Sequence, residues 1–108
     1  MAAKDPEDPV LERFRGAARK LYGERVARLV LFGSRARGDA RPDSDYDIAV
    51  FLHGDIPDRI EEIYRLADIS SAILEETGEF VHAMPYRAEA YDERTPLMHE
   101  IRREGLTL

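Results

Sequence analysis

The chain has 108 residues, of which 44% are hydrophobic and 35% charged, a composition that excludes a disordered protein and fits one globular domain over residues 1–108. It has no cysteine, which excludes disulfides and thiolate metal sites and is compatible with a reducing cytoplasm. Acidic residues outnumber basic ones by 22 to 16, for a net charge of −6, so we expect no direct nucleic-acid binding, which depends on clustered Lys and Arg. The longest apolar runs, such as Ile48–Leu52, are far shorter than the roughly 20 residues of a membrane span. We therefore expect no membrane partner and a cytoplasmic location.

The first part of the chain predicts a helix followed by a strand. We expect residues 1–7 to form a frayed tail. Asp8-Pro9 is typical of a helix N-cap with proline at the first helical position, and Gly23 is typical of a helix end. Val26–Phe32, a short run rich in branched residues, predicts the first strand. The apolar residues at helical spacing are Val10, Phe14, Ala17 or Ala18, and Leu21.

The next stretch, residues 33–44, is rich in glycine and charge and predicts a loop with a turn or two of helix from Ser34. Asp45–Leu52 then alternates in the manner of a strand. Its two faces carry Tyr46, Ile48, Val50 and Leu52 on one side, and Asp45, Asp47, Ala49 and Phe51 on the other.

The second half predicts a long helix and a third strand. Asp55-Ile56-Pro57 is expected to open the helix, and Gly78 to end it. Glu79–Met84 predicts the strand, with Pro85 as its end. The stripe of the helix predicted to be buried comprises Ile60, Ile63, Ala67, Ser70 and Leu74.

Thr95-Pro96 predicts the start of a capped last helix, which runs through Arg103 to Gly105. The resulting order is helix, strand, short helix, strand, helix, strand, helix. This alternation predicts an α/β protein in which helices cover a sheet, although the spacing does not fix the order of the strands.

The stretch from residue 33 to residue 47 combines three features that suit a nucleoside triphosphate. Gly33-Ser34 follows an apolar strand and begins a short helix, where free N–H groups and a hydroxyl suit a phosphate. Asp45 and Asp47 are two residues apart on a strand, so both carboxylates point to one face and can bind Mg²⁺ beside the phosphates. The arginines close by, which can neutralise a polyphosphate, are Arg35, Arg37 and Arg41.

Gly33-Ser34, a gap of ten residues and Asp45-Tyr46-Asp47 together resemble the signature of the polymerase-β-like nucleotidyltransferases. The short chain and its closing segment, Leu97–Gly105, resemble the minimal nucleotidyltransferase (MNT) group of that superfamily. The similarity covers most of the chain, from Val10 to Leu106. It implies the nucleotidyltransferase fold, with a mixed β-sheet packed by helices.

The resemblance also implies a function. Family members use Mg²⁺ to transfer a nucleoside monophosphate from a triphosphate to a hydroxyl, and many minimal members are antitoxins that modify a tyrosine of a HEPN-domain ribonuclease toxin with AMP. We therefore expect a protein adenylyltransferase that uses ATP and forms a hetero-oligomer with a HEPN toxin. Carried over to this sequence, Gly33 and Ser34 would hold the β- and γ-phosphates, and Asp45 and Asp47 would be catalytic and bind the metal. Arg35 and Arg37 are candidates for contacts with the triphosphate, and a solvent-facing role for one of them stays open.

One position departs from the family pattern. The family supplies a third carboxylate from the next strand, and aligning Val81 and Pro85 with that pattern places His82 where the acid is expected. A neutral imidazole can act as a base and as a metal ligand, although Mg²⁺ prefers oxygen. We therefore include His82 among the candidate catalytic residues.

Two other functions stay open. A protein that has lost its third acid can neutralise a partner by binding alone, with no transfer. The fold also occurs in small-molecule nucleotidyltransferases of the aminoglycoside-modifying kind, but a chain of 108 residues offers little structure for a dedicated small-molecule pocket.

Overall fold

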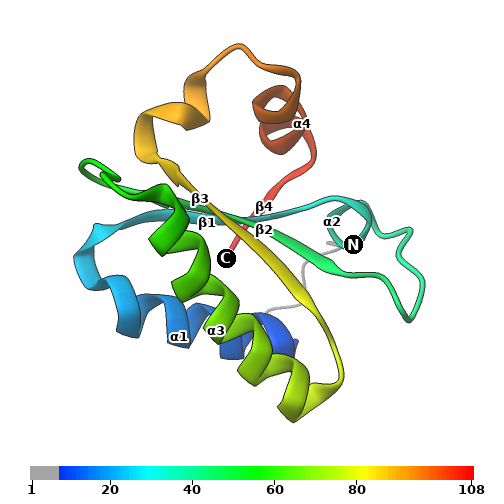
Figure 1. Ribbon diagram of the computed structural model, residues 1–108. Helices are drawn as coiled ribbons and strands as arrows, with labels where there is room; N and C mark the ends of the chain where they lie inside the picture. Colours follow the sequence, from blue (N-terminus) through cyan, green and yellow to red (C-terminus); the bar gives the residue numbers. More distant parts are fainter. Residues whose placement is uncertain (1–7) are drawn as a thin grey trace.

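The computed structural model describes residues 8–108, so the expected frayed tail, residues 1–7, lies outside the described residues. Helices and strands alternate along the chain as predicted, and a fourth, short strand is added at the end (Figure 1). The helices are α1 (Pro9–Tyr22), α2 (Ser34–Arg37), α3 (Arg59–Thr77) and α4 (Pro96–Glu104), with 3-10 turns η1 (Gly23–Arg25) and η2 (Ala88–Asp92). The strands are β1 (Val26–Phe32), β2 (Tyr46–Leu52), β3 (Val81–Arg87) and β4 (Leu106–Thr107).

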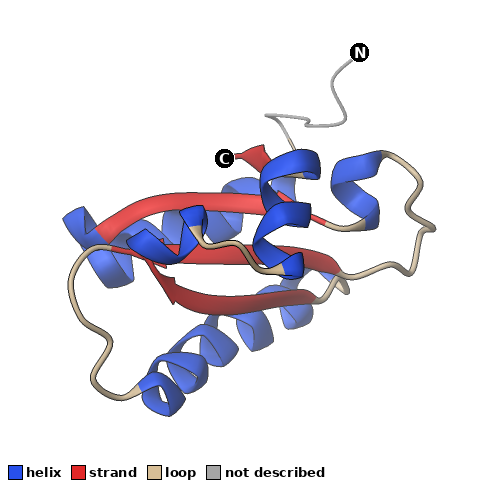
Figure 2. Cartoon of the chain, turned by 90° about the horizontal axis from the view of Figure 1, so that it is seen from above, coloured by secondary structure: helices blue, strands red, loops and turns tan. Residues whose placement is uncertain are grey.

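The strands form one mixed sheet in the order β3-β2-β1-β4. β1 pairs antiparallel with β2 and with β4, whereas β2 and β3 are parallel. Parallel neighbours need a crossover connection, and α3 provides it. Figure 2 shows the strands side by side, with helices on both faces of the sheet. The predicted α/β class with a mixed sheet packed by helices is confirmed.

β2 lies at the centre of the core because both of its faces are covered. In Figure 1, α1 and α3 lie on one side of the sheet, and α4 lies on the other. Ile48 and Val50 belong to the apolar cluster on the α1 and α3 side, whereas Phe51 packs with Met98 and Ile101 of α4. The predicted alternation of this strand is therefore confirmed. It also assigns odd-numbered positions of β2 to the α4 side of the sheet.

Side-chain caps fix the starts of α1 and α4 where the sequence predicts them. Asp8 accepts hydrogen bonds from two backbone N–H groups of the first turn of α1, at 2.8 and 3.4 Å, and Pro9 opens the helix. Thr95 accepts one at 3.1 Å from the first turn of α4, which Pro96 opens. Each cap satisfies N–H groups that have no acceptor within the helix, an effect of about 1 kcal/mol.

The predicted buried stripe of α3 is wrong at most of its positions, since Ser70 alone of its members is buried. The helix starts at Arg59, after the N-cap Asp58, and not near Asp55. Ile60 and Leu74 of the predicted stripe are 59% and 44% exposed. The side chains of α3 that are buried are those of Glu62, Leu66, Ser70 and Ile73.

Glu62 explains this difference. Its carboxylate is buried because it accepts a 2.8 Å hydrogen bond from the hydroxyl of Tyr22 and a 3.1 Å bond from Arg65. Tyr22 takes the inward place predicted for Leu21, which is 41% exposed. A polar residue therefore occupies the inner face of α3, and several apolar residues lie on its outer flank.

The end predicted for the third strand is also wrong, because β3 continues through Pro85 to Arg87. β3 is an edge strand, and proline is tolerated there since it has no N–H to leave unpaired. The carbonyl of Pro85 accepts a 3.0 Å hydrogen bond from Arg59 of α3. In the part of the chain that the structure describes, no helix is long and apolar enough to cross a membrane.

Candidate active site

The motif residues meet at one rim of the sheet, where β1 ends, α2 begins and β2 starts. Gly33 joins β1 to α2 with φ 78° and ψ −159°, a conformation that only glycine adopts readily. A β-carbon at this position would lie 2.7 Å from Oδ2 of Asp47. Gly33 therefore allows the backbone at the start of α2 to approach the carboxylate of Asp47, which any side chain at this position would push away.

Asp45 and Asp47 are two residues apart in the sequence but differ in environment. Asp45 is exposed just before β2, whereas Asp47 is half-buried within the strand. Burial raises the pKa of Asp47, His82 opposes this rise, and the negative charges of Asp45 and Glu100 add to it. The two aspartates are thus close enough to repel each other, and a cation bound between them would relieve that repulsion.

His82 lies opposite Asp47 in the parallel pairing of β3 with β2. Its Nδ1 is 3.5 Å from Oδ1 of Asp47, and its side chain is 56% exposed. The structure thus brings His82 to the site and leaves it open to solvent, while Val81 and Ala83 on either side of it point into the core. An imidazole in this place can exchange a proton with a substrate that approaches the rim.

The last helix adds two acids that the sequence reasoning missed. Glu104 accepts a 3.1 Å hydrogen bond from Arg37 of α2, and this ion pair links α4 to the helix after Gly33. Glu100 lies one turn earlier on α4, and its charge acts on Asp47. The four-residue spacing of Glu100 and Glu104 on a helix is visible in the sequence. The sequence does not show that α4 packs on the side of the sheet where Asp47 lies.

The two candidate arginines of α2 have different surroundings. Arg35 donates to the carbonyl of Ser44 at 2.8 Å and to Oε1 of Glu79 at 3.4 Å, and its guanidinium lies 4.3 Å from the ring centre of Tyr46. These contacts hold the guanidinium of Arg35 against the loop that precedes β2. Arg37 is more exposed and pairs with Asp39 and Glu104. Of the two side chains, that of Arg37 is the more accessible to a triphosphate.

The middle residue of the Asp-x-Asp motif points away from the candidate site. Tyr46 is buried on the α1 side, where its hydroxyl donates a 3.0 Å hydrogen bond to Asp8. Burial and this bond raise the pKa of Tyr46 to about 12. The same aspartate caps α1. Tyr46 therefore ties the start of β2 to α1 and holds the flanking aspartates at the rim.

The donor set fits a magnesium ion that is shared with a substrate. Among residues 8–108, no group of three or more His, Asp or Glu side chains forms a complete metal site. Asp45 and Asp47 supply two hard oxygen donors, and Mg²⁺ commonly takes its other ligands from phosphates and water. The close approach of the Gly33 backbone to Asp47 places the start of α2 beside these donors.

Comparisons with known proteins identify the family of the chain and relatives of its fold. The family model of the nucleotidyltransferase domain matches residues 11–101. A Methanocaldococcus jannaschii protein, provisionally named a protein adenylyltransferase, is 27% identical over 88 residues, 82% of this chain and 81% of the relative. The fold is similar to a chain in the crystal structure of a toxin–antitoxin with AMP-PNP (TM-score 0.64, 20% identity, 89% of this chain and 69% of the other). It is also similar to a chain in the structure of the tri-AMPylated Shewanella oneidensis HEPN toxin in complex with MNT antitoxin (TM-score 0.54, 17% identity, 91% and 70%). This chain belongs to the nucleotidyltransferase domain family.

Proposed function

We propose that the protein is a Mg²⁺-dependent enzyme that moves AMP from ATP to a hydroxyl of a partner protein, as the cytoplasmic antitoxin of a HEPN-type toxin. The observation that carries this proposal is the close approach of the Gly33 backbone to Asp47, whose carboxylate also feels the negative charge of Asp45 just before β2. The adenylyltransferase name of the archaeal relative and the AMPylated HEPN toxin bound to its antitoxin support AMP as the transferred group.

In the proposed reaction, the acceptor oxygen forms a bond to the α-phosphorus of ATP, the bond from that phosphorus to the bridging oxygen breaks, and pyrophosphate leaves. The backbone of Gly33 and the N–H groups at the start of α2 hold the β- and γ-phosphates. Asp45 and Asp47 hold Mg²⁺, which when bound neutralises the triphosphate and aligns the attacking oxygen. His82, next to Asp47 and open to solvent, accepts the proton that the hydroxyl loses.

A second function is favoured by one specific observation. His82 lies beside Asp47, at the position where the resemblance to the family implies a third acid, and its nitrogen is a poorer ligand for Mg²⁺ than a carboxylate oxygen. A site with two carboxylates and one imidazole also suits a protein that retains the fold and the partner surface but transfers no AMP. The two functions share the fold and differ in chemistry.

The experiment that separates the two functions incubates the protein with Mg²⁺, ATP labelled at the α-phosphate, and the proposed partner, a HEPN-type toxin encoded by a neighbouring gene. Transfer predicts label on the toxin, lost with Asp45→Asn and on removal of the metal by a chelator. Arg19→Gln, at an exposed position of α1, is the matched control and keeps the labelling. A complex that forms and restrains the toxin without any label contradicts the enzyme and supports neutralisation by binding.

A further inference from the structure

The outer flank of α3 carries an apolar seam that no part of the described chain covers. Ile60, Tyr64 and Leu74 are 59%, 68% and 44% exposed, which makes them three of the six exposed large hydrophobic residues in the described part. Ala67 and Ser71 lie between them and are exposed as well. The spacings from residue 60 to residue 74 are four, three, four and three. This is the a/d spacing of a heptad seam, which packs against another helix at a shallow crossing angle.

An acidic row runs along one side of this seam. Glu61, Asp68 and Glu75 follow the seam positions and recur every seven residues. Glu61 is paired with Arg65 at 2.7 Å. In residues 8–108, the side chains of Asp68 and Glu75 make no ion pair or hydrogen bond. The other side of the seam carries no charge, since its residues are Ile63, Ser70 and Thr77.

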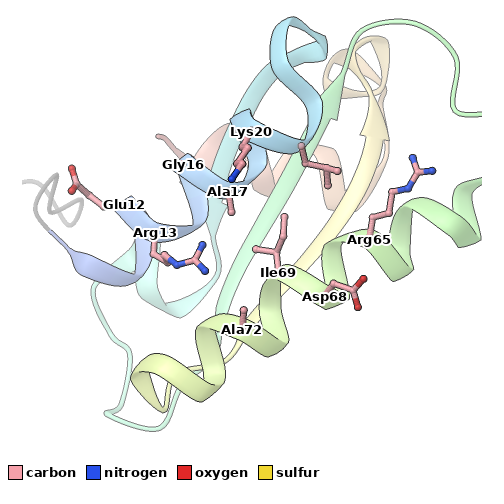
Figure 3. A pocket seen from close by; sticks show the side chains of 10 residues that line it. Glu12, Arg13, Gly16, Ala17, Lys20, Arg65, Asp68, Ile69 and Ala72 are labelled. Atoms are coloured by element: carbon pink, nitrogen blue, oxygen red, sulfur yellow. The ribbon is translucent and has the colours of Figure 1, made fainter.

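The groove between α1 and α3 differs from the seam in its charge. Its volume is about 740 Å³, and small residues such as Gly16, Ala17 and Ala72 line it (Figure 3). Its charged residues have mixed signs: Glu12 and Asp68 are acidic, and Arg13, Lys20 and Arg65 are basic. The groove therefore selects no partner by charge, whereas the seam has one acidic side.

We propose that the seam is the docking site for an amphipathic helix of a partner protein, with an apolar stripe that packs on Ile60, Tyr64 and Leu74. Lysine or arginine residues along one side of that helix would face the acidic row. A second copy of this chain is a poorer match, because antiparallel pairing of two seams places acidic row against acidic row, and parallel pairing places each acidic row against a flank with no charge. α3 and α4 lie on opposite sides of the sheet, so a helix docked on the seam leaves Asp47 accessible (Figure 1). The inference does not depend on AMP transfer.

The test uses the full chain and two synthetic peptides of about three heptads with leucine at the seam positions. One peptide has lysine along the flank of its seam, and the other has glutamate. Fluorescence anisotropy should show that the lysine peptide binds about tenfold more tightly or better. The double variant Asp68→Lys/Glu75→Lys should reverse this preference, because both side chains are exposed and the row becomes basic.

Apolar variants complete the test. Ile60→Ala/Tyr64→Ala should weaken the binding of the lysine peptide about tenfold or more, whereas Leu21→Ala, at an exposed apolar residue of the α1–α3 groove, should leave it unchanged. Equal binding of the two peptides, or a loss with Leu21→Ala as large as that at the seam, would overturn the proposal. So would a homodimer in analytical ultracentrifugation that the seam variants dissolve.

Discussion

Asp47 and His82 stand opposite each other on parallel neighbouring strands, with Nδ1 of His82 3.5 Å from Oδ1 of Asp47. The side chain of Asp47 is 34% exposed and that of His82 is 56% exposed. The acid is thus held in the rim, while the imidazole is open to the side from which a substrate approaches. This asymmetry suggests separate roles: Asp47 holds the metal and His82 moves a proton.

Asp47→Asn should abolish AMP transfer and at the same time raise the stability of the fold at neutral pH. The loss of a metal ligand should lower the transfer rate by roughly a hundredfold or more. The gain in stability follows because burial raises the pKa of Asp47, so its charged form is disfavoured in the folded state. Radiolabel transfer and thermal unfolding measure the two effects.

The pH dependence of this gain has a definite sign. Asp47 costs no stability below its unfolded pKa of about 3.9, because it is protonated in both states. The cost develops as pH rises from that value and is complete above the raised pKa of the folded state. The variant should therefore exceed the parent in free energy of unfolding at pH 7 and match it near pH 3. Asp45→Asn, at an exposed position, is the control that should lose transfer with a smaller gain, because it relieves only the repulsion from Asp45 and not the burial of Asp47. A variant less stable than the parent at pH 7 would contradict the argument.

Gly33→Ala should prevent ATP binding. The added β-carbon would lie 2.7 Å from Oδ2 of Asp47, so the carboxylate proposed to hold Mg²⁺ beside the phosphates would have to move. The positive φ of 78° also becomes strained, at about 1–3 kcal/mol. Isothermal titration calorimetry measures the affinity for ATP.

Gly54→Ala separates the two effects, because Gly54 has a similar φ of 84° but no atom within 4 Å of an added β-carbon. It should lose stability and keep the affinity for ATP. If a folded Gly33→Ala variant binds ATP as the parent does, the phosphates bind elsewhere.

Tyr22→Phe should lower the free energy of unfolding by about 2 kcal/mol, because the buried carboxylate of Glu62 loses its 2.8 Å hydrogen bond. Burial and this bond also raise the pKa of Tyr22, so its hydroxyl is a donor at every pH at which the fold is studied. Chemical denaturation measures the change. Tyr64→Phe, at a side chain that is 68% exposed, should change stability by less than about 0.5 kcal/mol. Equal effects of the two variants would refute a structural role for the Tyr22–Glu62 bond.

Local signals made much of the fold predictable from sequence. Asp8-Pro9 and Thr95-Pro96 marked helix starts correctly because caps act within one turn. The bounds of β1, Val26–Phe32, are as predicted because its run of branched residues is short and flanked by charges. The α4 side of β2 was also predictable, since alternation places Asp47 and Phe51 on one face.

Non-local contacts account for what the sequence did not predict. α3 has apolar residues on two of its flanks. The flank that faces the core is the one with Glu62, because Tyr22 and Arg65 donate hydrogen bonds to its buried carboxylate. Proline ends most strands, but Pro85 does not end β3, because β3 is an edge strand and its outer edge has no partner strand. The approach of Glu100 to Asp47 depends on the packing of α4, which periodicity does not specify.

His82→Asp decides between the two chemical readings of the site. If His82 is the base, the parent should transfer AMP and lose this activity in acid, because a protonated imidazole accepts no proton. His82→Asp should then keep the activity and move this loss to lower pH, because a carboxylate stays ionised in more acidic solution and is a better ligand for Mg²⁺. His82→Ala should lower the rate about a hundredfold with no loss of fold, since the side chain is exposed and only its contact with Asp47 is removed. His99→Ala, at an exposed histidine on α4, is the matched control and should leave the rate unchanged. A parent without activity that gains transfer with His82→Asp would show that this site has lost its chemistry. A transfer rate that is the same in the parent, His82→Asp and His82→Ala would show that His82 takes no part in the reaction.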